Sequence, residues 1–558
     1  MKKIGIFIVL IISIIQFNQV NACTNFLISK GASADGTPMI TYAADSHTLY
    51  GELYYWPAAN YKTGTMVDVY EWDTGKFMGK IPQATHTYQV VGNMNEHQLS
   101  IGETTFGGRK ELASQTGAIV DYGSLIYLTL QRAKNAREAI KVMGELVKEY
   151  GYASSGESFS IADSEEVWIL EMIGKGEGNK GAVWVARKIP DGYISGHANQ
   201  ARITQFPLDN SKECLYSPDV ISFAREKGWF KGTNSEFSFS DTYAPVEFGG
   251  ARFCDARVWA GFNKVNKDMG KYEKYVLGEI TYDKNKYATN RIPLWIKPDA
   301  PLTLENVFSL MRDHFEGTVL EMTKDLGAGP YQLPYRWRPL TWKVDSAVYC
   351  HERAISTQQT GFSFIAQGRS NLPDPIGGVL WFGVDDTYST CYMPVYCGIN
   401  QVPNSLKVGN GDFLTWSETS AFWTFNTVAN FCYLRYNDMI KDVQKVQSRK
   451  EKEFMNSIKA TDQKALDYWN KGDKKNAIKT LTAYSVNQVE TTVKDWKELG
   501  HYLIIKYKDG NIMKEKDGKF ERNKYGKLPA EPLQPPYPDS WYRMIINNNK
   551  EHFKAVEE

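Results

Sequence analysis

The sequence lacks several features that would place it directly in a common class. Its 65 Lys and Arg residues balance 64 Asp and Glu residues, so no overall electrostatic attraction to nucleic acid is expected. Only seven of its 558 residues are cysteine, and none has CxxC or Cys/His metal spacing. We therefore expect no nucleic-acid partner, no metal or other cofactor, and no disulfide bridge.

Long apolar runs are also scarce. Only residues 4–17 form one, directly after Lys2 and Lys3, and no second run approaches the length of a membrane span. Val20 and Ala22 lie three residues and one residue before Cys23, the small-residue spacing that signal peptidase accepts. We predict that residues 1–22 are a signal peptide. The protein would then be exported to the periplasm or the extracellular space, with no integral membrane span.

Cleavage after Ala22 would make Cys23 the first residue of the mature chain, with a thiol and a free α-amine on one residue. An α-amine titrates at about 8 and a thiol at about 8.5, so the amine can accept the thiol's proton. This pairing is typical of N-terminal-nucleophile hydrolases. Two alternatives are a small buried residue and a lipidated cysteine. Val20 and Asn21 fit a lipobox poorly, because such a motif usually has Leu and a small residue at these positions.

The segment after Cys23 is typical of a β-hairpin. Residues 24–29 and 38–43 are short apolar runs, and Asp35-Gly36 between them is a strong turn signal. Folding back at this turn carries Asp45 to within a residue or two of Cys23. A carboxylate there can orient the amine and change its pKa. The alternative is that Asp45 only caps the strand.

Further patterns indicate regular structure beyond the hairpin. Residues 99–106 alternate and lead into Gly107-Gly108, which predicts a strand ending near a site. Residues 124–150 carry one apolar face, which predicts a helix capped by Gly151. Period-two patterns at 158–163, 167–172 and 182–189 predict an antiparallel meander. Aromatic residues make up 13% of the chain, which suggests a sheet-rich fold with an aromatic-lined cleft.

The composition changes after residue 440. Lys-rich helical patterns follow, and the chain is Pro-rich toward its end. We divide the chain into a signal peptide (1–22), a catalytic domain (23–440), and a C-terminal region (441–558) of Lys-rich helices and a Pro-rich tail.

Two more segments contain candidate site residues. Asn199, in the small and polar stretch GHANQA, could direct its amide toward a developing oxyanion, or could serve only its own turn. Arg257, in RFCDARVWAGFN, could anchor a carboxylate, or could form a structural ion pair.

Several separated segments together resemble the secreted dipeptidases of the N-terminal-nucleophile cysteine peptidase family, which includes the secernins. More distantly, the chain is similar to the choloylglycine hydrolases. The resemblance implies an α+β fold: a four-layer αββα sandwich of antiparallel sheets, with Cys23 at the start of an inner strand and a C-terminal helical region. The segments are CTNFLISKGASADGT, DYGSLIYLTLQRAKNAREAI, ESFSIADSEEVWILEM, VWVARKIPDGYISGHANQARI, RSNLPDPIGGVLWFGVDD and TWSETSAFWTFNTVAN.

The resemblance also implies roles for individual residues. Cys23 matches the nucleophile, Asp45 the acid at the end of the second strand, and Asn199 the oxyanion asparagine. Thr104 lies near a second oxyanion position, and Arg257 is a candidate for the arginine near the nucleophile.

Tyr42 is a departure from the family pattern, because relatives usually have Arg three residues before the acid. Its phenol could contact substrate in a neutral role. Strand alternation would instead place Tyr42 and Asp45 on opposite faces unless a bulge intervenes, and we therefore favour a core position for Tyr42.

These features predict an enzyme, a cysteine-dependent hydrolase of small peptides and specifically a dipeptidase. One alternative is a choloylglycine-type acylase of non-peptide amides. The other is a lipid-anchored surface binding protein that uses Cys23 as its lipobox cysteine. The sequence makes no prediction of the oligomeric state.

Overall fold

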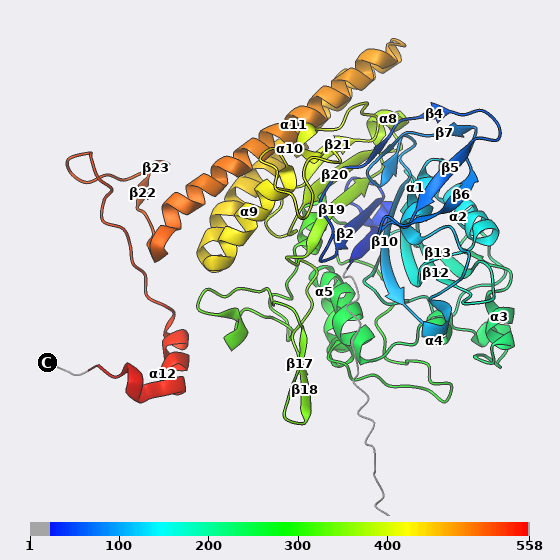
Figure 1. The fold of residues 1–558 in the computed structure, drawn as a ribbon, viewed down its shortest axis with the longest axis horizontal. Coiled ribbons are helices and arrows are strands. Elements are labelled where there is room, and N and C mark those ends of the chain that lie inside the picture. Colours follow the sequence, from blue (N-terminus) through cyan, green and yellow to red (C-terminus); the bar gives the residue numbers. More distant parts are fainter. Residues whose placement is uncertain (1–22, 556–558) are drawn as a thin grey trace, which may run out of the picture.

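The computed structural model describes residues 23–555 (Figure 1). The predicted signal peptide lies outside this range. All seven cysteines lie within it and are free thiols. No helix in the described range is both long and apolar enough to cross a membrane. The same range contains no cluster of three or more His, Cys, Asp or Glu side chains that could hold a metal ion.

A seven-stranded antiparallel sheet contains the predicted hairpin. The pairing of Leu27 with Ile40 and of Ile28 with Met39 confirms it, and Gly36 at the predicted turn has a positive φ of 69°. The strands, in spatial order, are β16 (Trp295–Ile296), β14 (Ile194–His197), β1 (Asn25–Ile28), β2 (Met39–Asp45), β19 (Thr360–Gln367), β20 (Val379–Val384) and β21 (Met393–Tyr396).

An eight-stranded antiparallel sheet contains the predicted meander. Residues 99–106 correspond to its strand β10, as predicted. The strands, in spatial order, are β15 (Cys214–Tyr216), β13 (Ala182–Lys188), β12 (Val167–Gly174), β11 (Gly156–Ala162), β10 (Ser100–Gly107), β9 (Met94–Asn95), β8 (Val90–Val91) and β3 (Tyr55–Trp56).

The two sheets pack against each other. A Cβ atom on Gly102 of β10 would lie 2.8 Å from the Asn25 amide and 3.2 Å from Tyr42 Cβ, so glycine permits the close approach. Alternation along β1 places Phe26 on the other face, where its ring packs closely on Gly261 of α5 (Ala256–Val265). Each sheet therefore has one face toward the other sheet and one face toward helices.

The helical segment predicted at 124–150 is two helices, so the prediction of a single helix is wrong. They are α1 (Tyr122–Leu130) and α2 (Ala136–Tyr150). The chain breaks between them because Asn135 accepts a hydrogen bond from the backbone N–H of Glu138 and caps a new helix. Gly151 ends α2 with φ of 77°, as predicted. The apolar faces of both helices pack on the eight-stranded sheet.

Three helices, α9 (Ala421–Leu434), α10 (Tyr436–Asn470) and α11 (Lys474–Tyr507), form the C-terminal helical region (Figure 1). Phe425 of α9 stacks on Trp496 of α11 with ring centroids 4.8 Å apart. The α11 residue Ser485 accepts a hydrogen bond from the backbone N–H of Tyr396 in β21. Residue 440, the predicted domain boundary, lies inside α10.

The remaining elements surround these layers or lie in the C-terminal tail, which extends away from the sheets (Figure 1). They are β4 (Ala59–Asn60), β5 (Met66–Tyr70), β6 (Phe77–Pro82), β7 (His86–Thr87), β17 (Thr341–Val344), β18 (Ala347–Cys350), β22 (Glu515–Lys516), β23 (Lys519–Phe520), α3 (Val220–Glu226), α4 (Phe239–Tyr243), α6 (Glu273–Val276), α7 (Leu304–Met311), α8 (Asp374–Gly377) and α12 (Asp539–Phe553).

Candidate active site

Cys23 lies two residues before β1, between the two sheets. Its side chain is buried, and its sulfur faces two groups: Tyr42 Oη at 3.9 Å and Glu103 Oε1 at 3.8 Å. Burial raises the pKa of the Cys23 thiol well above its ordinary value, and the negative charges of Glu103 and Asp45 raise it further. The neighbouring acidic groups therefore disfavour the thiolate.

Arg257 of α5 holds the backbone around Cys23. Its Nη1 donates to Cys23 O at 2.6 Å and to Thr24 Oγ1 at 2.7 Å. Its Nη2 donates to Ala198 O at 3.0 Å and to Asn199 Oδ1 at 2.8 Å, and its Nε donates to Phe253 O at 2.9 Å. The side chain is fully buried, so its hydrogen bonds join the start of β1 to the loop after β14.

Asn199 lies beside Cys23. The register of β1 and β14 pairs Asn25 with His197, and two residues beyond each of these Arg257 binds both Cys23 O and Asn199 Oδ1. The Asn199 backbone adopts a positive φ of 64°, and Nδ2 donates to Thr105 O at 2.6 Å. Because that amide nitrogen carries two hydrogens, one N–H is left for another acceptor.

Thr104 faces the same loop rather than the Cys23 sulfur. Its hydroxyl is 2.7 Å from His197 Nδ1 and accepts from the backbone N–H of Asn199 at 3.3 Å. His197 Nε2 is 2.7 Å from Ser160 Oγ, so the imidazole bridges the two sheets. Burial, together with the charge of Arg202, lowers the His197 pKa to about 3, and this histidine is therefore neutral near pH 7.

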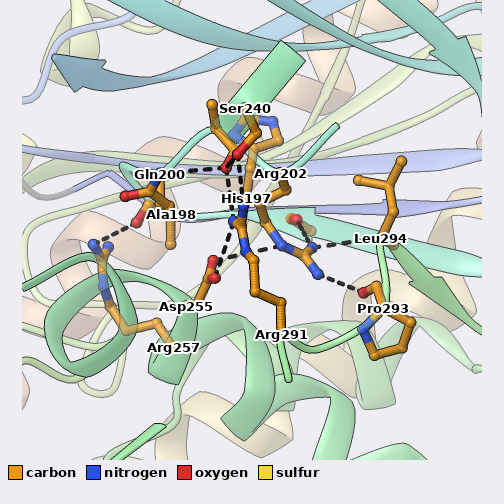
Figure 2. A network of polar contacts seen from close by, with 12 residues as sticks. His197, Ala198, Gln200, Arg202, Ser240, Asp255, Arg257, Arg291, Pro293 and Leu294 are labelled. Atoms are coloured by element: carbon orange, nitrogen blue, oxygen red, sulfur yellow. Dashed lines mark hydrogen bonds and ion pairs between the residues drawn. The ribbon is translucent and has the colours of Figure 1, made fainter. Parts of the chain in front are cut away.

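A buried charged network supports the other side of this loop (Figure 2). Arg202 donates to Gly196 O, and its Nε lies 3.5 Å from Asp255 Oδ1. Arg291 pairs with Asp255 Oδ2 at 3.2 Å and donates to Ala201 O at 2.7 Å. Asp255 precedes α5, so the network and Arg257 fix the same loop against the same helix.

Asp45 ends β2 and is buried. Thr360 Oγ1 donates to its Oδ1 at 2.6 Å, while Oδ2 has no hydrogen-bond partner among residues 23–555. Burial raises the Asp45 pKa to about 8, and the Thr360 hydrogen bond and nearby arginines, including Arg257 and Arg338, act in the opposite direction. The free oxygen is suited to accept a hydrogen bond from an ammonium group.

Tyr42 combines a core ring with a hydroxyl in the site. Its ring packs edge-on against Phe362 and Phe364, at centroid distances of 5.7 and 5.6 Å, as expected of a core residue. Its hydroxyl nevertheless donates to Glu103 Oε1 at 2.5 Å. Tyr42 and Asp45 nevertheless both line one cavity. Asp45 is the last residue of β2, and the register of β2 with β19 shifts beside it because β19 has the extra residue Gly361 there.

That cavity, of about 220 Å³, opens beside the Cys23 sulfur. Its walls are rich in aromatic rings, which agrees with the aromatic-lined cleft that the composition suggests. The rings belong to Tyr42, Tyr50, Tyr54, Trp56, Trp72, Tyr122, Tyr127 and Phe362. Asn199 lines a second cavity of about 590 Å³, together with Arg109, Arg338 and Arg353.

The sequence reasoning did not identify Glu103 or Glu157. Thr105 Oγ1 donates to Glu157 Oε1 at 2.7 Å, and the two carboxyl groups interact directly. The sequence does contain one indication of a functional role for them. Each is an acidic residue inside a strand, β10 or β11, whose other residues are mostly apolar or small. Acidic residues are almost never fully buried unless paired, so this position in a strand is informative.

Known proteins resemble most of the chain. The model of peptidase family C69 matches residues 51–449. A protein named "Probable dipeptidase" from Salmonella dublin is 24% identical over 428 residues, covering 72% of this chain and 86% of that protein. A "Probable dipeptidase" from Latilactobacillus sakei is 24% identical over 409 residues, covering 70% and 77%. A "Probable dipeptidase A" from Streptococcus pyogenes serotype M3 (strain SSI-1) is 24% identical over 439 residues, covering 75% and 84%.

Proposed function

This chain belongs to peptidase family C69. From that premise we propose that it is a dipeptidase whose nucleophile is Cys23, and that removal of the signal peptide makes Cys23 the first residue of the mature chain. The similarity to proteins named probable dipeptidases supports a dipeptide substrate. The family match begins after the hairpin that carries Cys23 and Asp45, so the roles of these two residues rest on their geometry.

The observation that carries the proposal is the position of Cys23. Its sulfur borders a cavity, its carbonyl is held by Arg257, and Asp45 Oδ2 is a buried acceptor without a partner in the described residues. An α-ammonium on Cys23 would supply the missing positive charge. It would lower the pKa of both the thiol and Asp45, since a nearby opposite charge favours each ionised form.

The reaction begins when the free α-amine takes the proton of the Cys23 thiol. The thiolate attacks the scissile carbonyl carbon, and the oxygen becomes an oxyanion. The remaining N–H of Asn199 Nδ2, with backbone N–H groups, donates to that oxyanion. The Cys23 ammonium then protonates the leaving amine, the C–N bond breaks, and the second amino acid departs from a thioester.

Water completes the cycle. The α-amine, neutral again, takes a proton from a water molecule as its oxygen attacks the thioester carbonyl. The C–S bond breaks, and the ammonium returns its proton to the sulfur, so the first amino acid leaves and the thiol is restored. Asp45 orients the amine throughout. Arg257 and Thr104 act as positioning residues, because their contacts are with the backbone and loop rather than with the cavity.

The layer arrangement supports a four-layer αββα sandwich. Helices α1 and α2 pack on the outer face of one sheet, α5 packs on the outer face of the other, and the inner faces meet at Gly102. We retain the proposed division into a catalytic domain (23–440) and a C-terminal region (441–558), with a removed signal peptide (1–22) and export. In this proposal no cofactor takes part.

The proposal is tested with three forms of the protein: a chain beginning at Cys23, the same chain with a blocked glycine before Cys23, and Cys23→Ala. Hydrolysis of dipeptides by the first form alone is expected. A peptide nitrogen is not basic, so the added glycine removes the base while keeping the thiol. Full activity of the blocked form would mean that another group is the base.

The two alternative functions give different outcomes. Hydrolysis of bile-salt or penicillin amides, but not dipeptides, would favour a choloylglycine-type acylase. Mass spectrometry of the natural N-terminus tests the lipid-anchored binding protein. A diacylglyceryl, N-acylated Cys23 would remove both thiol and amine and would refute the proposed enzyme.

A further inference from the structure

The cavity beside Cys23 holds acidic groups that the reaction above does not use. Glu103 and Asp73 line it, and Glu157 interacts directly with Glu103. In the described part of the chain, Glu103 Oε2 and Glu157 Oε2 are buried with no donor from another side chain, and the two carboxyl groups can hydrogen-bond to each other only when one of them is protonated. An ionised, buried carboxylate is costly without a donor or a cation beside it, and of these two groups only Glu103 lines the cavity, where a ligand can reach it.

Several polar groups act on Glu103. The charge of Asp73, in the turn between β5 and β6, raises the Glu103 pKa, whereas hydrogen bonds from Tyr42 of β2 and Glu157 of β11 lower it. Burial raises the Glu103 pKa to about 7, and burial and Glu103 together raise that of Glu157 well above its usual range. A positive ligand group would relieve this repulsion.

The geometry points to a role in substrate recognition: Glu103, supported by Glu157, binds the free α-ammonium group of the dipeptide's first residue. This inference rests on the proposed function, in which Cys23 attacks the carbonyl of that same residue. Glu103 thereby selects peptides with an unblocked amino terminus.

The distances agree with this assignment. Glu103 Oε1 lies 3.8 Å from the Cys23 sulfur. A carbonyl carbon poised for attack lies about 3–3.5 Å from its nucleophile. The α-nitrogen is two bonds farther along, about 2.5 Å from that carbon. A charge-assisted hydrogen bond from an ammonium to a carboxylate oxygen is roughly 2.7–2.9 Å long. The Cys23 sulfur can therefore contact the carbonyl carbon while the α-nitrogen of the same substrate residue binds Glu103 Oε1.

The cavity's size and walls suit one amino-acid residue. Its volume of about 220 Å³ is roughly seven times the share of one liquid water. Trp56 stacks on Tyr54 and Tyr127 at centroid distances of 5.8 and 5.2 Å, which gives an aromatic wall for the first side chain. Tyr122 holds Asp73 through a 2.7 Å hydrogen bond and keeps a second carboxylate near the ammonium.

The first experiment uses the unsubstituted chain beginning at Cys23. It compares kcat/KM for a dipeptide with an apolar first residue and for the same dipeptide N-acetylated, following release of the second amino acid. At least a 10-fold preference for the free amine is expected. Equal hydrolysis of the two would overturn the inference while leaving the proposed function intact. Hydrolysis of neither by this chain would remove both.

The second experiment uses Glu103→Gln, with the exposed Glu165→Gln as the control. Glu103→Gln should lower kcat/KM for the free dipeptide at least 10-fold, through KM, and should abolish the preference over the acetylated peptide. Poorer thiol ionisation would not account for such a loss, because the Glu103 charge raises the Cys23 pKa. Glu165, paired with Lys30 at the surface, should leave both constants unchanged.

Two outcomes would assign the carboxylates differently. Retention of the preference in a folded Glu103→Gln would overturn the role of Glu103. A preference for lysine at the first position that survives N-acetylation would mean that the site holds a side-chain ammonium instead. If Glu103→Gln does not fold, the comparison of free and acetylated peptides with the unsubstituted chain still decides whether the amino terminus is recognised.

Discussion

Tyr42→Phe removes one hydroxyl from the centre of the site and leaves the packing of the ring intact. The hydroxyl donates to Glu103 Oε1 at 2.5 Å, and this hydrogen bond lowers the Glu103 pKa. The substitution therefore leaves the Glu103 carboxylate without its phenol donor. A purely structural Tyr42 would make the change nearly silent.

The size of the effect follows from that hydrogen bond. A bond to a charged group contributes about 1.5–3 kcal/mol. Since one pKa unit corresponds to about 1.4 kcal/mol, its loss should raise the Glu103 pKa by about 1–2 units from its value of about 7. At pH 7 the ionised fraction would fall from about one half to between about 10% and 1%. The dissociation constant of a dipeptide should rise roughly 5- to 50-fold in proportion.

The measurement is calorimetric titration of a dipeptide into the mature Cys23→Ala protein, with and without Tyr42→Phe, between pH 5.5 and 8. Cys23→Ala prevents turnover and removes the thiol from the groups facing Glu103. Asp73, Glu157 and Tyr122 are the same in both proteins. Because only the carboxylate binds an ammonium, affinity should be lost as the pH falls through the Glu103 pKa, and this loss should begin at higher pH in Tyr42→Phe.

Tyr127→Phe is the matched control, since Tyr127 lines the same cavity and stacks on Trp56. Its pH profile should match that of the Cys23→Ala protein alone. An unshifted profile for Tyr42→Phe would refute the role given to the phenol. Equal shifts in both variants would attribute the effect to the cavity as a whole.

Three further predictions concern stability and turnover. Cys23→Ala should abolish dipeptide hydrolysis and change the free energy of unfolding, measured by denaturant titration, by no more than about 1 kcal/mol; residual hydrolysis above a mock preparation would exclude this nucleophile. Arg257→Lys replaces five donors by three, so it should cost about 2–6 kcal/mol of stability and lower kcat rather than raise KM; a pure KM effect would indicate substrate contact. Glu103→Gln should raise Tm at pH 8 but not at pH 4. The raised Glu103 pKa makes native stability fall as pH rises from about 4.5 toward 7, and glutamine removes this loss. An equal Tm change at both pH values would contradict this.

Local patterns were sufficient for much of the fold. The Asp35-Gly36 turn, the period-two strands of the meander, and Gly151 at the end of α2 each depend on residues close in sequence. The apolar periodicity of residues 124–150 continues across both helices and so predicts a single one. Only the cap at Asn135 marks where the second helix begins. The hairpin also places Asp45 near Cys23, because the two strands that it joins are close in sequence.

The sequence by itself determined the hairpin, the meander and the candidate nucleophile, because neighbouring residues set backbone turns and strand alternation. The tertiary structure alone decided which groups surround the Cys23 sulfur. Tyr42 and Glu103 are 61 residues apart, and Arg257 is 234 residues from Cys23. Their contacts depend on the register and close approach of strands in two different sheets, and on how one helix packs across them. No periodicity within a single strand or helix encodes that arrangement.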